Sequence, residues 1–227
     1  MIVPNYVPEP LEVPGNVTEE RYPVRLAFIR RVSLLHLLSV GVVAGLTFLP
    51  VPSVGWAVPS AILAGILIAL DLVRIQKRRE IVEASISAYA LPLVLLAAGW
   101  WIRELSLAGA AVWAPLVGIL AVNLYTVLCR NDYSFVGCWV LSLIGSTVAV
   151  AALIDSTMLG STYAAWALGL NAAYLTYHVY DLASLMARRR KGETLAAVVD
   201  LYRDVFNIFG YIPRVLAHWR KHRIWAK

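Results

Sequence analysis

The sequence is poor in charged residues, which make up only 15% of its 227 positions. Soluble globular domains carry roughly 25% charged residues. Hydrophobic residues account for 60% of the chain, and the mean hydropathy is +0.70. This shortage of charge argues against an ordinary soluble domain and predicts that the principal partner of the chain is a lipid bilayer.

Cysteine and recognisable catalytic motifs are also scarce. The two cysteines, Cys129 and Cys138, form neither a C-x-x-C pair nor a disulfide framework. The chain contains no H-E-x-x-H, G-x-S-x-G or P-loop motif. No lysine lies inside an apolar segment, where a retinal Schiff base would need one. We therefore expect no enzyme activity and no resident cofactor.

The net charge of +6 comes from basic residues in short clusters between apolar runs. Such a distribution is typical of membrane orientation signals, which gather on the cytosolic side. We therefore do not expect a nucleic-acid partner. The clusters precede the first apolar run and follow the second, fourth and sixth, so the N-terminus is expected to be cytosolic.

Seven apolar segments follow one another along the chain, and a membrane-spanning helix needs about 20 such residues. They cover residues 34–50, 54–73, 81–102, 107–129, 133–154, 158–186 and 194–218. The sequence thus predicts an all-α, polytopic membrane protein with seven transmembrane helices. We expect a disordered cytosolic tail (1–24), a seven-helix transmembrane domain (25–216) and a basic C-terminal tail (217–227). The seventh segment is the most polar, and it either spans the membrane or re-enters and returns.

Asp181 and Asp204 lie inside the last two apolar segments, where an ionisable side chain is costly and marks a functional candidate. Asp181 precedes Gly192, in the polar turn between them, by 11 residues, and Asp204 follows it by 12. In an antiparallel helix pair the two carboxylates would lie at nearly the same depth. They would then share a proton or bind a cation such as Ca²⁺, which prefers carboxylate oxygens.

Simpler interpretations stay open beside this one. Each aspartate can instead be held by a nearby tyrosine, backbone group or arginine. Asp200 lies one helical turn before Asp204 on the same face. It either adds a third carboxylate to the pair, towards the cytosol, or is a solvated residue near a helix start. His178 and His36 would form a zinc site with Asp181 only if the first and sixth segments touch.

Two stretches around these aspartates resemble the signatures of the transmembrane Bax inhibitor motif family. Residues 179–186 (V-Y-D-L-A-S-L-M) resemble its Y-D-T-x-x-L motif, and residues 200–209 (D-L-Y-R-D-V-F-N-I-F) resemble its S-L-Y-L-D-I-I-N-L-F motif. Residues 28–32 and 125–134 resemble two further, weaker family patterns. The resemblance covers residues 27–215 in the family's order.

The resemblance implies that the last helix is enclosed by the other six. It also implies a pH-sensitive calcium leak channel, gated by the Asp181–Asp204 pair, that modulates calcium homeostasis and cell death. The membrane would be the endoplasmic reticulum or another internal membrane in a eukaryotic or viral protein, and the plasma membrane in a prokaryotic one. Calcium ions and cell-death regulatory proteins would be the partners.

The chain departs from the family pattern at several positions. Leu182 replaces a small or polar residue, and Asp200 and Arg203 add an acid and a base beside the aspartate pair. Arg74 is the candidate for a basic residue that the family places near the pair. These departures would suit a divergent or viral member. The main alternative is a membrane interaction protein that regulates apoptosis or trafficking without transporting ions; a proton-coupled transporter would show repeated halves, which the sequence lacks.

Overall fold

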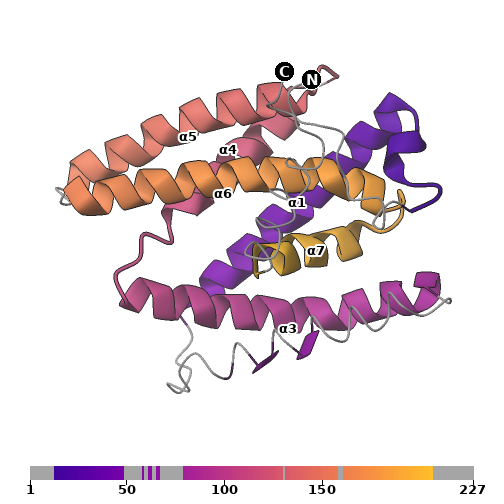
Figure 1. Cartoon of the computed structure of the whole chain (residues 1–227), viewed down its shortest axis with the longest axis horizontal. Helices are drawn as coiled ribbons and strands as arrows, with labels where there is room; N and C mark the ends of the chain where they lie inside the picture. Colours follow the sequence, from indigo (N-terminus) through magenta and orange to yellow (C-terminus); the bar gives the residue numbers. More distant parts are fainter. Residues whose placement is uncertain are drawn as a thin grey trace, which may run out of the picture.

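The computed structural model of the chain describes residues 13–48, 58, 61–62, 65–66, 79–129, 131–157 and 161–206, with the backbone alone at 79–89, 156–157, 161 and 203–206. All regular secondary structure in these ranges is helical (Figure 1). The elements are η2 (Val17–Glu19), α1 (Tyr22–Leu46), α3 (Arg79–Leu107), α4 (Ala114–Leu128), α5 (Phe135–Thr157), α6 (Ser161–Arg188) and α7 (Thr194–Phe206). The predicted all-α class is confirmed for this part of the chain.

Three of the described helices are long and apolar enough to cross a membrane: Tyr22–Leu46, Ala90–Leu107 and Phe135–Asp155. The helix Ala114–Leu128 is apolar but shorter. Most of the predicted second segment, and the seventh beyond residue 206, lie outside the described residues. The structure thus supports a helical membrane protein, and the number of seven spans stays a prediction.

Large apolar side chains face outward over much of the bundle. On α1, Leu34, Leu38 and Val42 are 53%, 59% and 52% exposed, while the face that carries Val32 and Val43 is buried. Further exposed apolar residues lie on α4, α5 and α6: Leu120, Leu124, Val127, Leu128, Leu141, Ile144, Val148 and Trp166. Soluble monomers rarely expose apolar patches of this extent, so this surface is suited to contact with lipid.

The beginning of the chain is more ordered than the sequence indicated. Residues 13–24 fall within the tail that we expected to be disordered, yet residues 13–20 pack against the bundle and α1 begins at Tyr22. Residues 22–33 and residues 34–46 of the first predicted apolar segment form one helix of 25 residues. Pro23 lies in its first turn, where a missing backbone N–H costs nothing. Residues 1–12 lie outside the described part.

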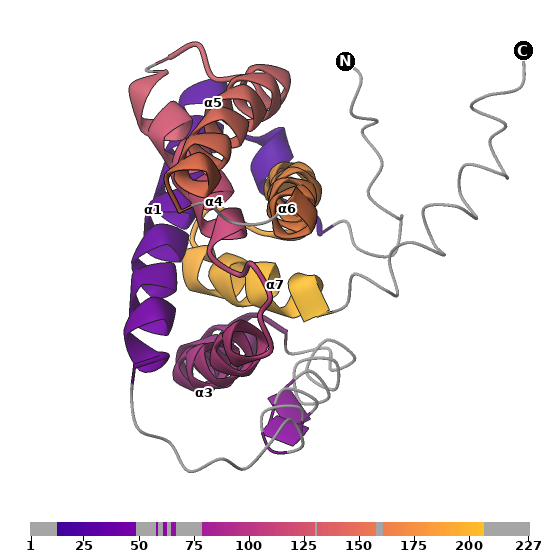
Figure 2. The same cartoon turned by 90° about the vertical axis from the view of Figure 1, so that its left-hand side faces the viewer.

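The last described helix, α7, lies inside the bundle and packs against α1, α3 and α6. Figure 2 shows it between α3 and α6. Its residues from Ala196 to Tyr202 are all buried. Enclosure of this helix by three others is therefore observed, and enclosure by six stays a prediction.

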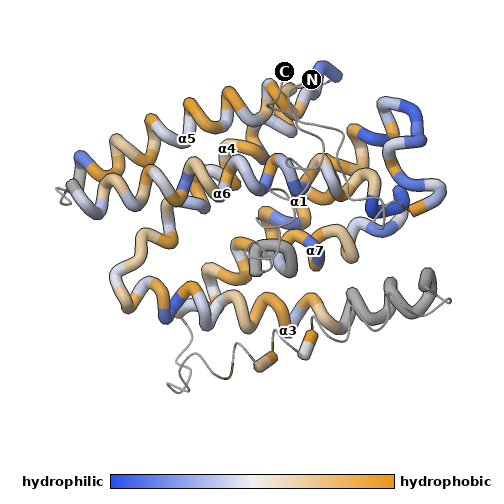
Figure 3. The backbone as a smooth tube through the Cα atoms, viewed as in Figure 1, coloured by the Kyte–Doolittle hydropathy of each residue, from blue (hydrophilic) through white to orange (hydrophobic). Residues whose placement is uncertain are grey.

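Basic residues gather at one end of the bundle, where α1 begins and α6 gives way to α7. The Tyr22 hydroxyl donates to the carbonyl oxygen of Tyr133 at 3.1 Å, and Arg30 Nε donates to that of Thr126 at 3.2 Å. Figure 3 shows hydrophilic residues at this end, which we refer to as the basic end. Because η2, directly before α1, packs against the end of α6, the basic clusters before the first predicted segment and after the sixth lie close together.

The helices α4 and α6 approach closely at Gly118. A Cβ atom added there would lie 2.7 Å from Oδ1 of Asn171 and 3.3 Å from Cβ of Leu175. Asn171 has little freedom to move away, because its Nδ2 donates to Ser146 Oγ at 2.8 Å. A side chain at position 118 would therefore disturb the α4–α6 contact.

We expect Gly118→Ala to be less stable than Gly41→Ala by about 1–3 kcal/mol, the usual cost of overpacking. Both changes add a methyl group to a helix and gain the same intrinsic propensity of about 1 kcal/mol. No described atom lies within 4 Å of a Cβ added at Gly41. Unfolding of the two variants in the same detergent measures the difference, and equal stability would contradict the close approach.

Candidate functional site

The first predicted site residue, Asp181, lies near the C-terminal end of α6 and is 2% exposed. Nη2 of Arg188 donates to Oδ1 of Asp181. The same nitrogen donates to Ser184 Oγ, and that bond is 2.7 Å long. Ser184 donates to Asp181 Oδ1 at 3.1 Å. The three residues share one helix face because they lie three, four and seven positions apart. Asp181 and Arg188 thus form a buried ion pair along a single helix.

The second buried ion pair joins α6 to α7. Asp200 on α7 is 1% exposed, and both Nε and Nη2 of Arg189 lie 2.7 Å from its Oδ2. Arg189 directly follows the last residue of α6 and is 4% exposed. Asp200 is therefore not the solvated residue that its place near a helix start suggested.

The predicted pairing of Asp181 with Asp204 is not tested, because the Asp204 side chain lies outside the described residues. The backbone of Asp204 and of Arg203 belongs to α7. Arg74, the predicted basic neighbour, also lies outside the described part. What the structure places beside Asp181 is Arg188, in agreement with the simpler interpretation that an arginine holds this aspartate.

Two histidines meet where α1 contacts α6. The rings of His36 and His178 stack with their centroids 4.8 Å apart, and the residues are 1% and 2% exposed. His36 Nδ1 and His178 Nε2 have no hydrogen-bond partner among the described residues. The first and sixth segments therefore touch, as a zinc site would require. However, no three His, Cys, Asp or Glu residues in the described ranges are grouped to hold a metal.

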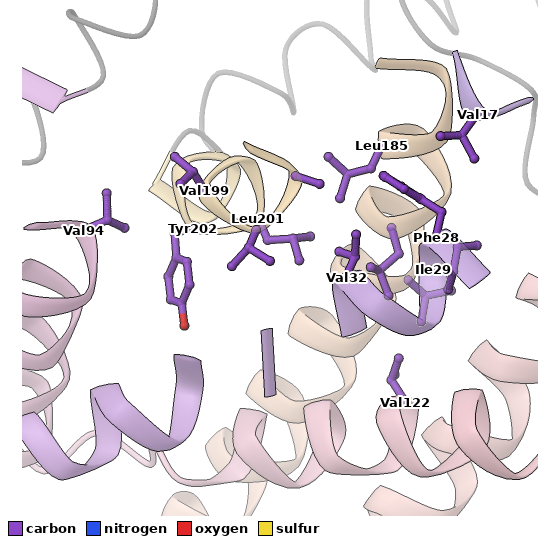
Figure 4. Packing of buried hydrophobic residues seen from close by; sticks show 14 of the residues in the cluster. Val17, Phe28, Ile29, Val32, Val94, Val122, Leu185, Val199, Leu201 and Tyr202 are labelled. Atoms are coloured by element: carbon purple, nitrogen blue, oxygen red, sulfur yellow. The ribbon is translucent and has the colours of Figure 1, made fainter. Parts of the chain in front are cut away.

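Tyr202 connects α7 to the histidines. Its ring lies edge-on to that of His36, with centroids 5.4 Å apart. Ser39 already donates to the carbonyl oxygen of His36 at 2.7 Å, so the Tyr202 hydroxyl is the donor in its 2.6 Å bond to Ser39 Oγ. Figure 4 shows the Tyr202 side chain leaving α7, with the hydroxyl at its far end.

Together these residues form a polar cluster inside the bundle. It combines two ion pairs, two stacked histidines and the hydrogen-bonded Tyr202, contributed by α1, α6, α7 and the turn between the last two. Burying charges is costly unless they are paired and hydrogen-bonded. Ionisable residues that face the interior of a membrane bundle are typical of ion and proton pathways.

Sequence reasoning identified Asp181, Asp200 and His178 but missed both arginines as site residues. Arg188 and Arg189 belong to a run of four basic residues that was interpreted only as an orientation signal. The spacing of seven residues between Asp181 and Arg188 was the one available indication, since it places both on the same helix face.

The chain was compared with protein-family models, with curated proteins and with solved structures. No protein-family model, no curated protein and no solved structure matches the chain.

Proposed function

We propose that the protein is a pH-sensitive calcium leak channel, without enzyme activity, in which Asp181 is the titrating group of the gate. The observation that carries this proposal is the buried Asp181–Arg188 ion pair inside a bundle of apolar helices. The resemblance of residues 179–186 and 200–209 to the transmembrane Bax inhibitor motif signatures supports the same function.

The chemistry of the ion pair suggests how protons would act. Ionised Asp181 neutralises Arg188, and its carboxylate oxygens are ligands of the kind that Ca²⁺ prefers. Protonation of Asp181 would leave Arg188 as an uncompensated cation on the pathway, and this charge would repel Ca²⁺. In the proposed gate Asp204 supplies a second carboxylate, with Arg203 and Asp200 as modulators.

The membrane arrangement is part of the proposal. The chain would span an internal membrane such as the endoplasmic reticulum, or a plasma membrane in a prokaryote, with seven helices. Its basic end and N-terminus would face the cytosol, because clustered Lys and Arg residues favour that side.

The test is Ca²⁺ flux into liposomes that contain the purified protein, measured in mildly acid and mildly alkaline buffer. We expect wild-type flux to be several-fold higher in alkaline buffer and Asp181→Asn to lose most of this pH dependence. Asp155→Asn makes the same chemical change at an exposed position near the end of α5 and should behave as wild type. Unchanged, pH-dependent flux in both Asp181→Asn and Asp204→Asn would refute the gate.

A second candidate function is favoured by the fact that Asp181 is already neutralised by an arginine of its own helix. Such a pair can be purely structural. The protein would then regulate apoptosis or trafficking by binding cell-death regulatory proteins. Full cellular activity of the Asp181→Asn, Asp204→Asn double variant, without flux in liposomes, would favour this alternative.

A further inference from the structure

Residues 13–20, which we call the N-terminal strap, lie across the C-terminal end of α6. Val13 N donates to the carbonyl oxygen of Ala187 at 3.1 Å, and Val17 N donates to that of Arg189 at 3.0 Å. The last carbonyl groups of a helix have no partner within it. The strap therefore supplies hydrogen-bond donors at the end of α6 that carries the two buried arginines.

An apolar anchor fixes the strap to the bundle. Val17 is fully buried and belongs to the main core cluster, together with Phe28 of α1 and Leu185 of α6. Figure 4 shows Val17 beside the last turns of α6. A residue in this position excludes water from the space between the strap and the two helices.

Polar contacts tie the strap to the exposed half of the basic run. Arg190 Nε donates to the carbonyl oxygen of Pro14 at 3.3 Å, and Lys191 Nζ lies 3.5 Å from Glu20 Oε1. The strap is acidic and the turn below it is basic, so opposite charges face each other. Arg190 and Lys191 thus bind the strap, while Arg188 and Arg189 point inward to their aspartates.

The strap also has a defined local structure. Asn16 is buried, and its Oδ1 accepts a hydrogen bond from Thr18 N at 2.9 Å, which caps the short helix η2. Gly15 adopts a φ of 72°, a left-handed conformation that glycine tolerates without strain, and its N–H donates to Glu19 Oε1 at 3.2 Å. The strap is therefore a folded cover with its own hydrogen bonds.

We propose that the N-terminal strap is an autoinhibitory seal that closes the basic end of the polar cluster. In the seated position it covers the end of α6, where Arg188 and Arg189 are only 3% and 4% exposed although they belong to a run of four basic residues. Its release would admit water and cations to the Asp181–Arg188 and Asp200–Arg189 pairs. The anchor is small, with the buried side chains of Val13, Asn16 and Val17, two backbone hydrogen bonds to the end of α6 and one surface ion pair. The strap can therefore detach without unfolding the helices.

The sealing role is tested in the full chain by hydrogen exchange of the backbone amides at residues 185–191. Val17→Asp would place a charge in the apolar anchor, and we expect exchange at the end of α6 to be at least several-fold faster than in wild type. Thr18→Asp adds the same side chain at the neighbouring exposed position. It removes only the Thr18 hydroxyl's bond to Asn16 within the strap, so it should accelerate exchange much less than Val17→Asp does. Equal exchange in Val17→Asp and wild type would overturn the proposal.

A milder variant distinguishes release of the strap from general unfolding. Glu20→Lys opposes Lys191 with a like charge at a surface position, and we expect a smaller acceleration confined to residues 185–191. Exchange within α5 should stay as in wild type in both variants. If exchange at the end of α6 rises only together with exchange in α5, the strap stabilises the whole fold and the sealing role is refuted.

The effect of the strap on flux rests on the proposed channel function, and the two can fail separately. With a functional channel, Val17→Asp should raise Ca²⁺ flux several-fold over Thr18→Asp in the same liposomes. Faster exchange with unchanged flux, in a protein that conducts, would overturn autoinhibition. Absence of flux in every variant, including wild type, would refute the channel function and leave the strap to be judged by exchange alone.

Discussion

Arg188→Met is expected to lower the free energy of unfolding by about 3–5 kcal/mol, the typical cost of leaving one member of a buried ion pair without its partner. Asp181 is 2% exposed, so water would compensate little of its charge. Methionine keeps much of the arginine's apolar length, so the variant leaves little cavity. The lost free energy of unfolding would therefore measure the effect of the unpaired charge. Unfolding by heat or denaturant in one detergent measures it.

The double variant Asp181→Leu, Arg188→Met separates pairing from burial. Because neither charge remains, its stability should return to that of wild type or exceed it by about 1–4 kcal/mol. Lys191→Met removes a basic residue whose side chain is 69% exposed, and it should change stability by no more than about 0.5 kcal/mol. If the double variant loses as much stability as Asp181→Leu alone and Arg188→Met alone together, the two residues do not form a direct ion pair.

Asp200→Leu is the second change with a large expected effect, again about 3–5 kcal/mol, because it removes the carboxylate that neutralises Arg189 inside the bundle. The region that Asp200→Leu loosens should differ from the region that Arg188→Met loosens, since the Asp200–Arg189 pair joins α7 to the end of α6. We expect hydrogen exchange to accelerate mainly along α7. In Arg188→Met, acceleration should instead centre on the last turns of α6.

Glu193→Gln is a suitable control for the Asp200 variant. Glu193 Oε2 accepts a hydrogen bond from the backbone N–H of Arg190 at 3.0 Å and lies 4.0 Å from Nη1 of Arg189. Glutamine can still accept from that N–H, so the loss should be within about 1 kcal/mol, as for a partly exposed ion pair. An equal loss in both variants would mean that Asp200 has no special role in fixing α7.

The basic run at residues 188–191 shows how neighbours in sequence take different roles. Arg188 turns back along α6 to Asp181, and Arg189 reaches Asp200 on the next helix. Arg190 and Lys191 contact the N-terminal strap. The run was interpreted from the sequence as a single orientation signal, because charge alone does not distinguish a surface arginine from one that is paired inside the bundle.

Several features of the fold could be predicted from local sequence. The low charge and long apolar runs indicated a helical membrane protein, because a bilayer admits only backbone whose polar groups are paired internally. The polar turn expected around Gly192 is confirmed, since α6 ends at Arg188 and α7 begins at Thr194. Asp181 could be predicted to be a buried acid, because a carboxylate within an apolar membrane helix almost always faces the interior of the bundle.

The helical class, the position of the last helix–turn–helix and the burial of Asp181 thus follow from the sequence alone, because each depends on composition within one or two helices. The packing of the helices was needed to establish which groups face one another: Arg188 with Asp181, Arg189 with Asp200, and His36 with His178. It was also needed to place the strap over the end of α6. Hydropathy is summed along the chain and needs no knowledge of neighbours in space. An ion pair or ring contact instead depends on helix packing and on side-chain conformation, which decide distances of a few ångströms.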